Sequence, residues 1–134
     1  MSDSLSMTKE HWKTDPEPQD YPAAESYLSL LIEPVEAAEL VEALRAVDRL
    51  ATYKAKDMLR ASGLPLLPAD NKHVLADLDK VKEGRKLSPV LLVRGEPMQI
   101  ADGYHRVCAS YHLDENADIP CRIASRSRPD AVTP

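Results

Sequence analysis

The chain has little of what several classes of protein require. Its 134 residues include no phenylalanine, one tryptophan and two cysteines. No apolar run approaches the length of about eighteen residues that a membrane helix needs, so we expect no membrane association. So few cysteines, and the absence of an apolar leader at the N-terminus, argue against a secreted domain held by disulfides. We therefore predict a cytoplasmic protein with reduced thiols and an aliphatic core.

Positive charge is also scarce. The 17 lysines and arginines are outnumbered by 22 aspartates and glutamates, which gives a formal net charge of −5 and a pI near 5.3. A general nucleic-acid binder needs a clustered basic face to neutralise phosphates, so nucleic acid is not an expected partner. Two cysteines and scattered histidines do not have the spacing of a zinc site, so no metal ligands are predicted.

The length suits one ordinary domain. Residues 1–24 are polar and rich in proline, which predicts a flexible N-terminal arm. Within it, Trp12 is suited to dock locally or on a partner. Residues 25–124 are predicted to form a single domain, with a helical region over 34–62 and a core over 74–124. The polar residues 125–134 are predicted to be a flexible tail.

Apolar spacing predicts the first elements of this domain. The short run Tyr27–Ile32 is typical of a strand. Residues 35–62 carry apolar side chains at helical spacing, which predicts one long helix or two joined ones, ended by Gly63. Asp70 or Asn71 is suited to cap the next helix, and Gly84 to stop it.

The second half of the chain predicts a small sheet. Residues 90–94 are the clearest strand, and Gly95 and Glu96 turn it into a hairpin with residues 98–101. A helix of about ten residues is predicted to start near Gly103 or Tyr104. Residues 119–123 read as the last strand, placed at the sheet edge because they contain a proline. The mixture of helices and strands indicates an α+β fold.

The segment Asp102-Gly103-Tyr104-His105-Arg106 is the candidate functional site. The first amides of the helix lack intrahelical partners and, with the helix dipole, favour an anion there. Arg106 is suited to clamp a phosphate, and His105 to bind it or exchange a proton. Asp102 is suited to hold magnesium or to accept a proton. The spacing by itself favours a structural interpretation, in which Asp102 caps the helix and the other side chains face water.

The order of elements adds a resemblance. A helix ending at Gly84 precedes a strand that opens with proline and continues with apolar residues, over residues 89–94. It is followed in order by a second strand, the Asp-Gly-Tyr-His-Arg turn, a helix and the closing strand of residues 119–123. In this order and motif, residues 75–123 resemble the ParB/sulfiredoxin-like superfamily. The resemblance implies a small mixed sheet with helices, here with a helical N-terminal extension, and nucleotide handling at the turn.

The chain departs from each known activity of that superfamily. Tyr104 stands where sulfiredoxin has its cysteine, so sulfinic acid reduction is not expected. His105 replaces one arginine of the partition protein's nucleotide motif. Asp102 matches the catalytic aspartate of the free-serine kinase, but His105 and Arg106 fall in a different register.

Two functional hypotheses follow. In the first, Gly103, Tyr104, His105 and Arg106 bind a nucleotide or other phosphorylated ligand, with Mg²⁺ as a candidate cofactor. Asp102 and His105 are then the candidate catalytic residues, for phosphotransfer or nucleotide hydrolysis. In the second, the chain is a non-catalytic interaction module, and the long helix and Trp12 contact a protein partner or a second copy in a homodimer. His73 is suited to face the turn, or is simply a solvated residue near a helix cap.

Overall fold

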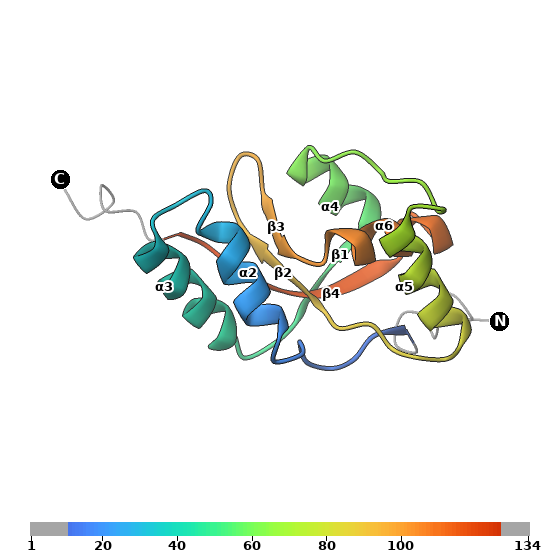
Figure 1. Cartoon of the computed structure of the whole chain (residues 1–134), viewed down its shortest axis with the longest axis horizontal. Helices are drawn as coiled ribbons and strands as arrows, with labels where there is room; N and C mark the ends of the chain where they lie inside the picture. Colours follow the sequence, from blue (N-terminus) through green and yellow to red (C-terminus); the bar gives the residue numbers. More distant parts are fainter. Residues whose placement is uncertain (1–10, 127–134) are drawn as a thin grey trace.

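The computed structural model describes residues 11–126, which form an α+β fold of five helices and a four-stranded mixed sheet (Figure 1). The helices are α2 (Asp20–Leu28), α3 (Pro34–Arg45), α4 (Ala55–Ser62), α5 (Lys72–Lys82) and α6 (Tyr104–Leu113). The strands are β1 (Ala51–Lys54), β2 (Val90–Val93), β3 (Gln99–Asp102) and β4 (Asp118–Ala124). Their order in the sheet is β1-β4-β2-β3, with β2 and β4 parallel and the other pairs antiparallel.

Helices cover both faces of the sheet. All four residues of β2 are buried, and they alternate between two apolar clusters. Val90 and Leu92 pack in the cluster that includes residues of α4, α5 and α6, whereas Leu91 and Val93 pack with α2 and α3. Figure 1 shows these two groups of helices on opposite sides of the sheet. An almost continuous apolar run is what a strand buried on both faces requires.

In the second half of the chain, the predicted helix cap, hairpin and helix start are confirmed. The Asn71 side chain accepts hydrogen bonds from the amides of His73 (3.0 Å) and Val74 (3.2 Å) and so caps α5. The hairpin of β2 and β3 and the start of α6 also lie where they were predicted. Leu92 pairs with Ile100 in the register of the hairpin.

The prediction for the N-terminal half was wrong in three places. Residues 11–24 are not a flexible arm: Trp12 is 6% exposed and forms a parallel bridge with Leu87, and α2 begins at Asp20. Residues 27–32 are the end of α2 and a turn rather than a strand. The long helix over 35–62 is interrupted by β1. Residues 1–10 and 127–134 of the two predicted flexible ends lie outside the described residues.

The predicted edge position of the last strand was also wrong, because β4 lies between β1 and β2. Its proline is tolerated for a local reason. Pro120 pairs with Thr52 of β1, whereas β2 pairs with β4 only from Cys121 onward. The missing amide of Pro120 therefore removes no hydrogen bond between β4 and β2.

Candidate functional site

The turn between β3 and α6 depends on glycine. Gly103 has φ +111°, in a region that side chains strongly disfavour. A Cβ atom at this position would lie 2.5 Å from Cγ1 of Val90 and 2.8 Å from Nη2 of Arg106. The backbone thus passes directly over β2 and places the start of α6 beside the sheet. Among the described side chains none caps this helix, which leaves its first amides available to a ligand.

A pocket of about 270 Å³ lies between this turn and α5. The turn and the first residues of α6 line one side, and α5 contributes side chains from successive turns of one helical face. The lining residues are His73, Ala76, Asp77, Lys80, Asp102, Gly103, His105 and Arg106. Four of the five residues predicted as the site therefore meet in one pocket.

Tyr104 is the exception among the predicted site residues. Its hydroxyl donates a 2.6 Å hydrogen bond to the carbonyl of Pro65, and its side chain does not line the pocket. About two turns further along α6, a ring nitrogen of His112 lies 2.7 Å from the carbonyl oxygen of Leu67. These two contacts tie the connector before α5 to α6, and so help to fix α5 against the turn.

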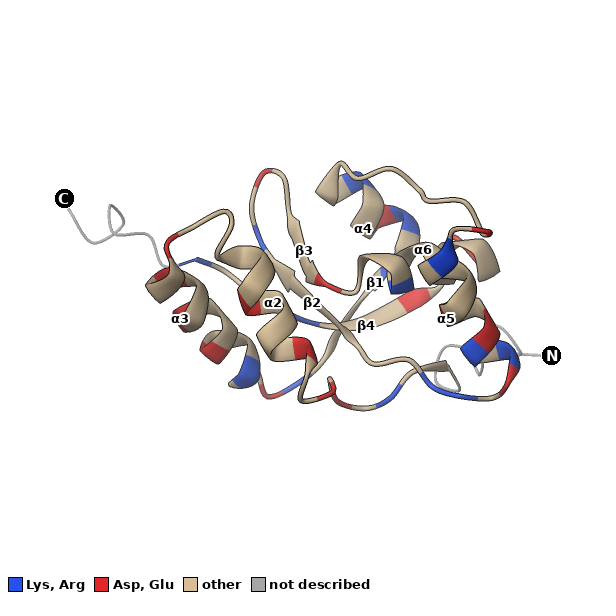
Figure 2. Ribbon diagram, viewed as in Figure 1, with Lys and Arg blue, Asp and Glu red and all other residues tan. Residues whose placement is uncertain are grey.

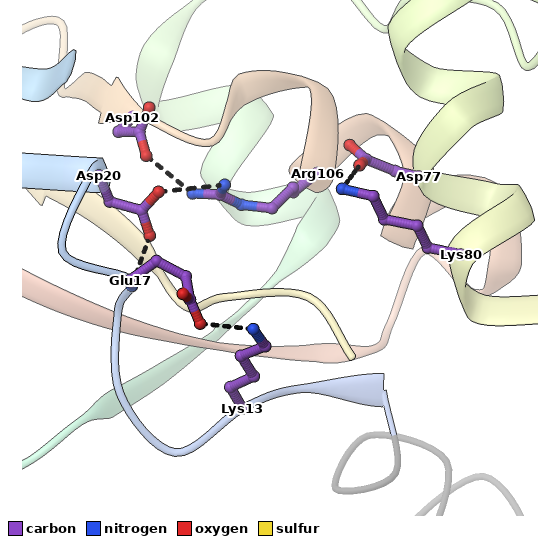
Figure 3. Close-up of polar contacts among 7 residues, drawn as sticks. All are labelled: Lys13, Glu17, Asp20, Asp77, Lys80, Asp102 and Arg106. Atoms are coloured by element: carbon purple, nitrogen blue, oxygen red, sulfur yellow. Dashed lines mark hydrogen bonds and ion pairs between the residues drawn. The ribbon is translucent and has the colours of Figure 1, made fainter. Parts of the chain in front are cut away.

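Two carboxylates surround the guanidinium of Arg106 (Figure 3). Nη2 donates a 3.0 Å hydrogen bond to Oδ2 of Asp102, and Nη1 lies 3.8 Å from Oδ1 of Asp20, at the start of α2. Within the described chain, Nε of Arg106 is buried without a hydrogen-bond partner. Arg106 is therefore held by carboxylates of this chain, and its predicted role as a phosphate clamp stays a prediction.

The carboxylates of the pocket are harder to ionise than usual. Burial raises the pKa of Asp102, and the neighbouring Asp20 adds to this, while Arg106 opposes it. Burial likewise raises the pKa of Asp77, although Lys80, 3.9 Å away, lowers it. A carboxyl group whose pKa is raised is better suited to exchange a proton near neutral pH.

The two histidines of the pocket are in contact. The ring centroids of His73 and His105 lie 4.7 Å apart. Burial lowers the pKa of His105, and His73 lowers it further, whereas Asp77 opposes both. The lowered pKa favours the neutral imidazole of His105 in the free protein, whereas an anion in the pocket would favour its protonation.

Sequence reasoning missed part of this pocket. His73 was noted as a residue suited to face the turn, and it does. Asp77 and Lys80 were not singled out, although they follow His73 at positions i+4 and i+7 and so share one face of α5. Asp20 gave no signal, because its contact with Arg106 joins residues far apart in the sequence.

No group of three or more histidine, cysteine, aspartate or glutamate side chains in residues 11–126 is arranged to hold a metal ion. In the same range, none of the helices has the length and apolar character needed to cross a bilayer. Along α3, three glutamates precede a single arginine, whereas α4 and α5 carry both lysines or arginines and aspartates (Figure 2). Comparison with family models, curated proteins and solved structures gives no match to the chain.

Proposed function

We propose that the chain binds a nucleotide or another phosphorylated ligand in the pocket between α5 and the Asp102–Arg106 turn. The observation that carries this proposal is the pocket itself, which brings Lys80, His73 and His105 to the uncapped start of α6. Lysine, imidazole and free backbone amides are the groups that bind phosphate oxygens in proteins.

The acidic residues of the pocket give magnesium a role with the ligand. Mg²⁺ is commonly held by one or two carboxylates together with substrate phosphates. Asp77 and Asp102 both line the pocket, and two carboxylates fit that mode although they do not form a complete metal site. Asp102 and His105 are the residues that we propose for proton transfer, should the bound ligand react.

The order of elements supports a finer proposal for the fold. The elements follow one another in the order of the ParB/sulfiredoxin-like superfamily: a helix, β2, β3, the turn, α6 and the closing strand β4. We propose that the chain shares that fold, with α2 and α3 as its helical extension. The pocket then lies at the turn where the superfamily handles nucleotides.

A second candidate function is supported by another observation. Four apolar side chains near the junction of α2 and α3 are exposed, which is typical of a contact surface for protein. They are Tyr27 (37%), Leu30 (83%), Leu31 (52%) and Val35 (70%). This surface replaces the one first predicted, since Trp12 is buried and the long helix is interrupted.

Ligand binding is tested by thermal shift and calorimetry with inorganic pyrophosphate and the four ribonucleoside triphosphates, each with and without Mg²⁺. Selective binding to the folded state stabilises it by about 2.7 kcal/mol at a ligand concentration of about 100 times Kd. Lys80→Gln should weaken binding by about tenfold or more, because a charge-assisted contact contributes about 1.5–3 kcal/mol. Lys82→Gln is the matched control, since Lys82 lies on the same helix but does not line the pocket. Equal affinities of the two variants, or no binding by the parent, would contradict the proposal.

A further inference from the structure

The N-terminal segment, defined as residues 11–20, pairs with Leu87 just before β2 and ends at Asp20, which faces Arg106 of the pocket. The amide of Lys13 donates to the carbonyl of Leu87 (2.8 Å), and the amide of Leu87 donates to the carbonyl of His11 (2.8 Å). Trp12, at the centre of this pairing, is buried in the core beneath β2. The segment therefore follows a fixed course from Leu87 to Asp20, the first residue of α2.

Asp20 is held in place by two kinds of contact. One carboxylate oxygen, Oδ2, accepts a 2.9 Å hydrogen bond from the amide of Glu17, and the other, Oδ1, faces Arg106 (Figure 3). Only 6% of the residue is exposed. A buried carboxylate needs a cation, and Arg106 is the cation that Asp20 faces.

The arrangement places more negative than positive charge around Arg106. Asp102 already forms the shorter contact with the guanidinium, 3.0 Å against 3.8 Å for Asp20. One guanidinium therefore faces two carboxylates in a largely buried environment. The second carboxylate lowers the positive potential that an incoming phosphate would experience from Arg106, because like charges in a low dielectric interact strongly.

We propose that Asp20 is a built-in counter-anion for Arg106 that weakens phosphate binding in the pocket, so that the N-terminal segment regulates the site. This inference rests on the proposed function. It implies reciprocal coupling: a partner that draws residues 11–20 away from Leu87 and Arg106 tightens ligand binding, and bound ligand loosens the segment by the same factor. The ligands whose affinity depends on the position of this segment are anionic and place phosphate oxygens near Arg106.

The test compares two substitutions that make the same chemical change on this segment. Asp20→Asn removes the charge beside Arg106 but keeps an oxygen that can accept the amide of Glu17. Asp15→Asn is the matched control, because Asp15 pairs instead with Arg122, at 3.5 Å. We expect Asp20→Asn to bind inorganic pyrophosphate and ribonucleoside triphosphates about tenfold more tightly than the parent, equivalent to about 1.4 kcal/mol. Asp15→Asn should bind like the parent.

The outcomes separate this inference from the proposed function. Tighter binding by Asp20→Asn alone supports the inference, including the case in which only that variant binds measurably. Equal or weaker binding by Asp20→Asn, with a parent that binds, overturns the inference and leaves the proposed function standing. If neither the parent nor either variant binds, the proposed function fails and the inference with it.

Two further measurements need no ligand. Trp12 is the only tryptophan, so its emission reports whether each variant keeps the N-terminal segment docked. A carbon NMR titration of the Asp102 carboxyl group should show its pKa fall in Asp20→Asn, because a neighbouring negative charge has been removed. An unchanged Asp102 titration in a docked variant would show that Asp20 does not act on this site, and the inference would be wrong.

Discussion

Replacement of Gly103 by alanine tests the geometry on which the pocket depends. The substitution adds one carbon atom at φ +111°, 2.5 Å from Cγ1 of Val90 and 2.8 Å from Nη2 of Arg106. Val90 is fully buried, so it has little room to move. A side chain in this backbone region costs about 1–3 kcal/mol, and overpacking a closely packed core costs about 1–3 kcal/mol. We expect Gly103→Ala to lower the free energy of unfolding by about 4 kcal/mol.

Gly84→Ala separates the two contributions. Gly84 also has a positive φ, of 78°, but a Cβ atom there would meet no atom within 4 Å. This control variant should therefore lose only the backbone contribution, about 1 kcal/mol. Each kcal/mol corresponds to about 4 °C in the melting temperature of a domain of this size. Urea titration and thermal melts should thus place Gly103→Ala about 15 °C below the parent and Gly84→Ala about 4 °C below it. Equal losses in the two variants would refute the close approach of Gly103 to Val90.

Two other predictions concern stability. Nη1 of Arg122 donates to three carbonyls at and just after the end of α3, those of residues 44, 45 and 47. Arg122→Met should therefore lower the free energy of unfolding in urea by about 2–3 kcal/mol. Arg126→Met is the control, because it breaks only a half-exposed ion pair with Glu36 and should lower the free energy of unfolding by less than about 1 kcal/mol. Similar losses of stability in the two variants would contradict this role for Arg122. Because the pKa of His105 is lowered from its ordinary 6.5, the unfolded chain binds more protons in the window just below that value, and the parent should lose stability as the pH falls through it. His105→Gln should remove that part of the pH dependence, and identical urea midpoints against pH for the two proteins would disprove the assignment.

The sequence predicted best where local signals and tertiary packing agree. The cap at Asn71, the strand of residues 90–93 and the glycine turn at Gly103 each follow from short-range chemistry, and the structure confirms all three. Four of the five predicted site residues line one pocket for the same reason, since they belong to one turn. Whether that pocket binds phosphate is a separate prediction, which the experiments above address.

The errors in predicting the elements arose where the composition of a segment did not match its burial or its distant contacts. Residues 27–32 have the composition of a strand, yet Leu28 is buried while Leu30 is 83% exposed, so burial there follows the end of α2. The strand β1 was missed because three of its four residues are exposed, which leaves no apolar signal. The fixed course of residues 11–20 was missed because Trp12 and Asp20 contact Leu87 and Arg106, which are distant in the sequence. Composition describes a segment, but it does not report which remote surface that segment covers.

The position of β4 between β1 and β2 has a consequence for how the chain folds. The hairpin of β2 and β3 can form from local residues alone, whereas β1 has β4 as its strand partner and must wait for it. Closing the sheet therefore brings residues 51–54 against residues 118–121 across a long loop. The conformational entropy of that loop is lost before the pairing of β1 with β4 stabilises the chain. Until β4 inserts, β1 and one edge of β2 remain open to pairing with other chains. The rate of productive folding should accordingly depend on how quickly the last strand docks, rather than on the helices or the hairpin.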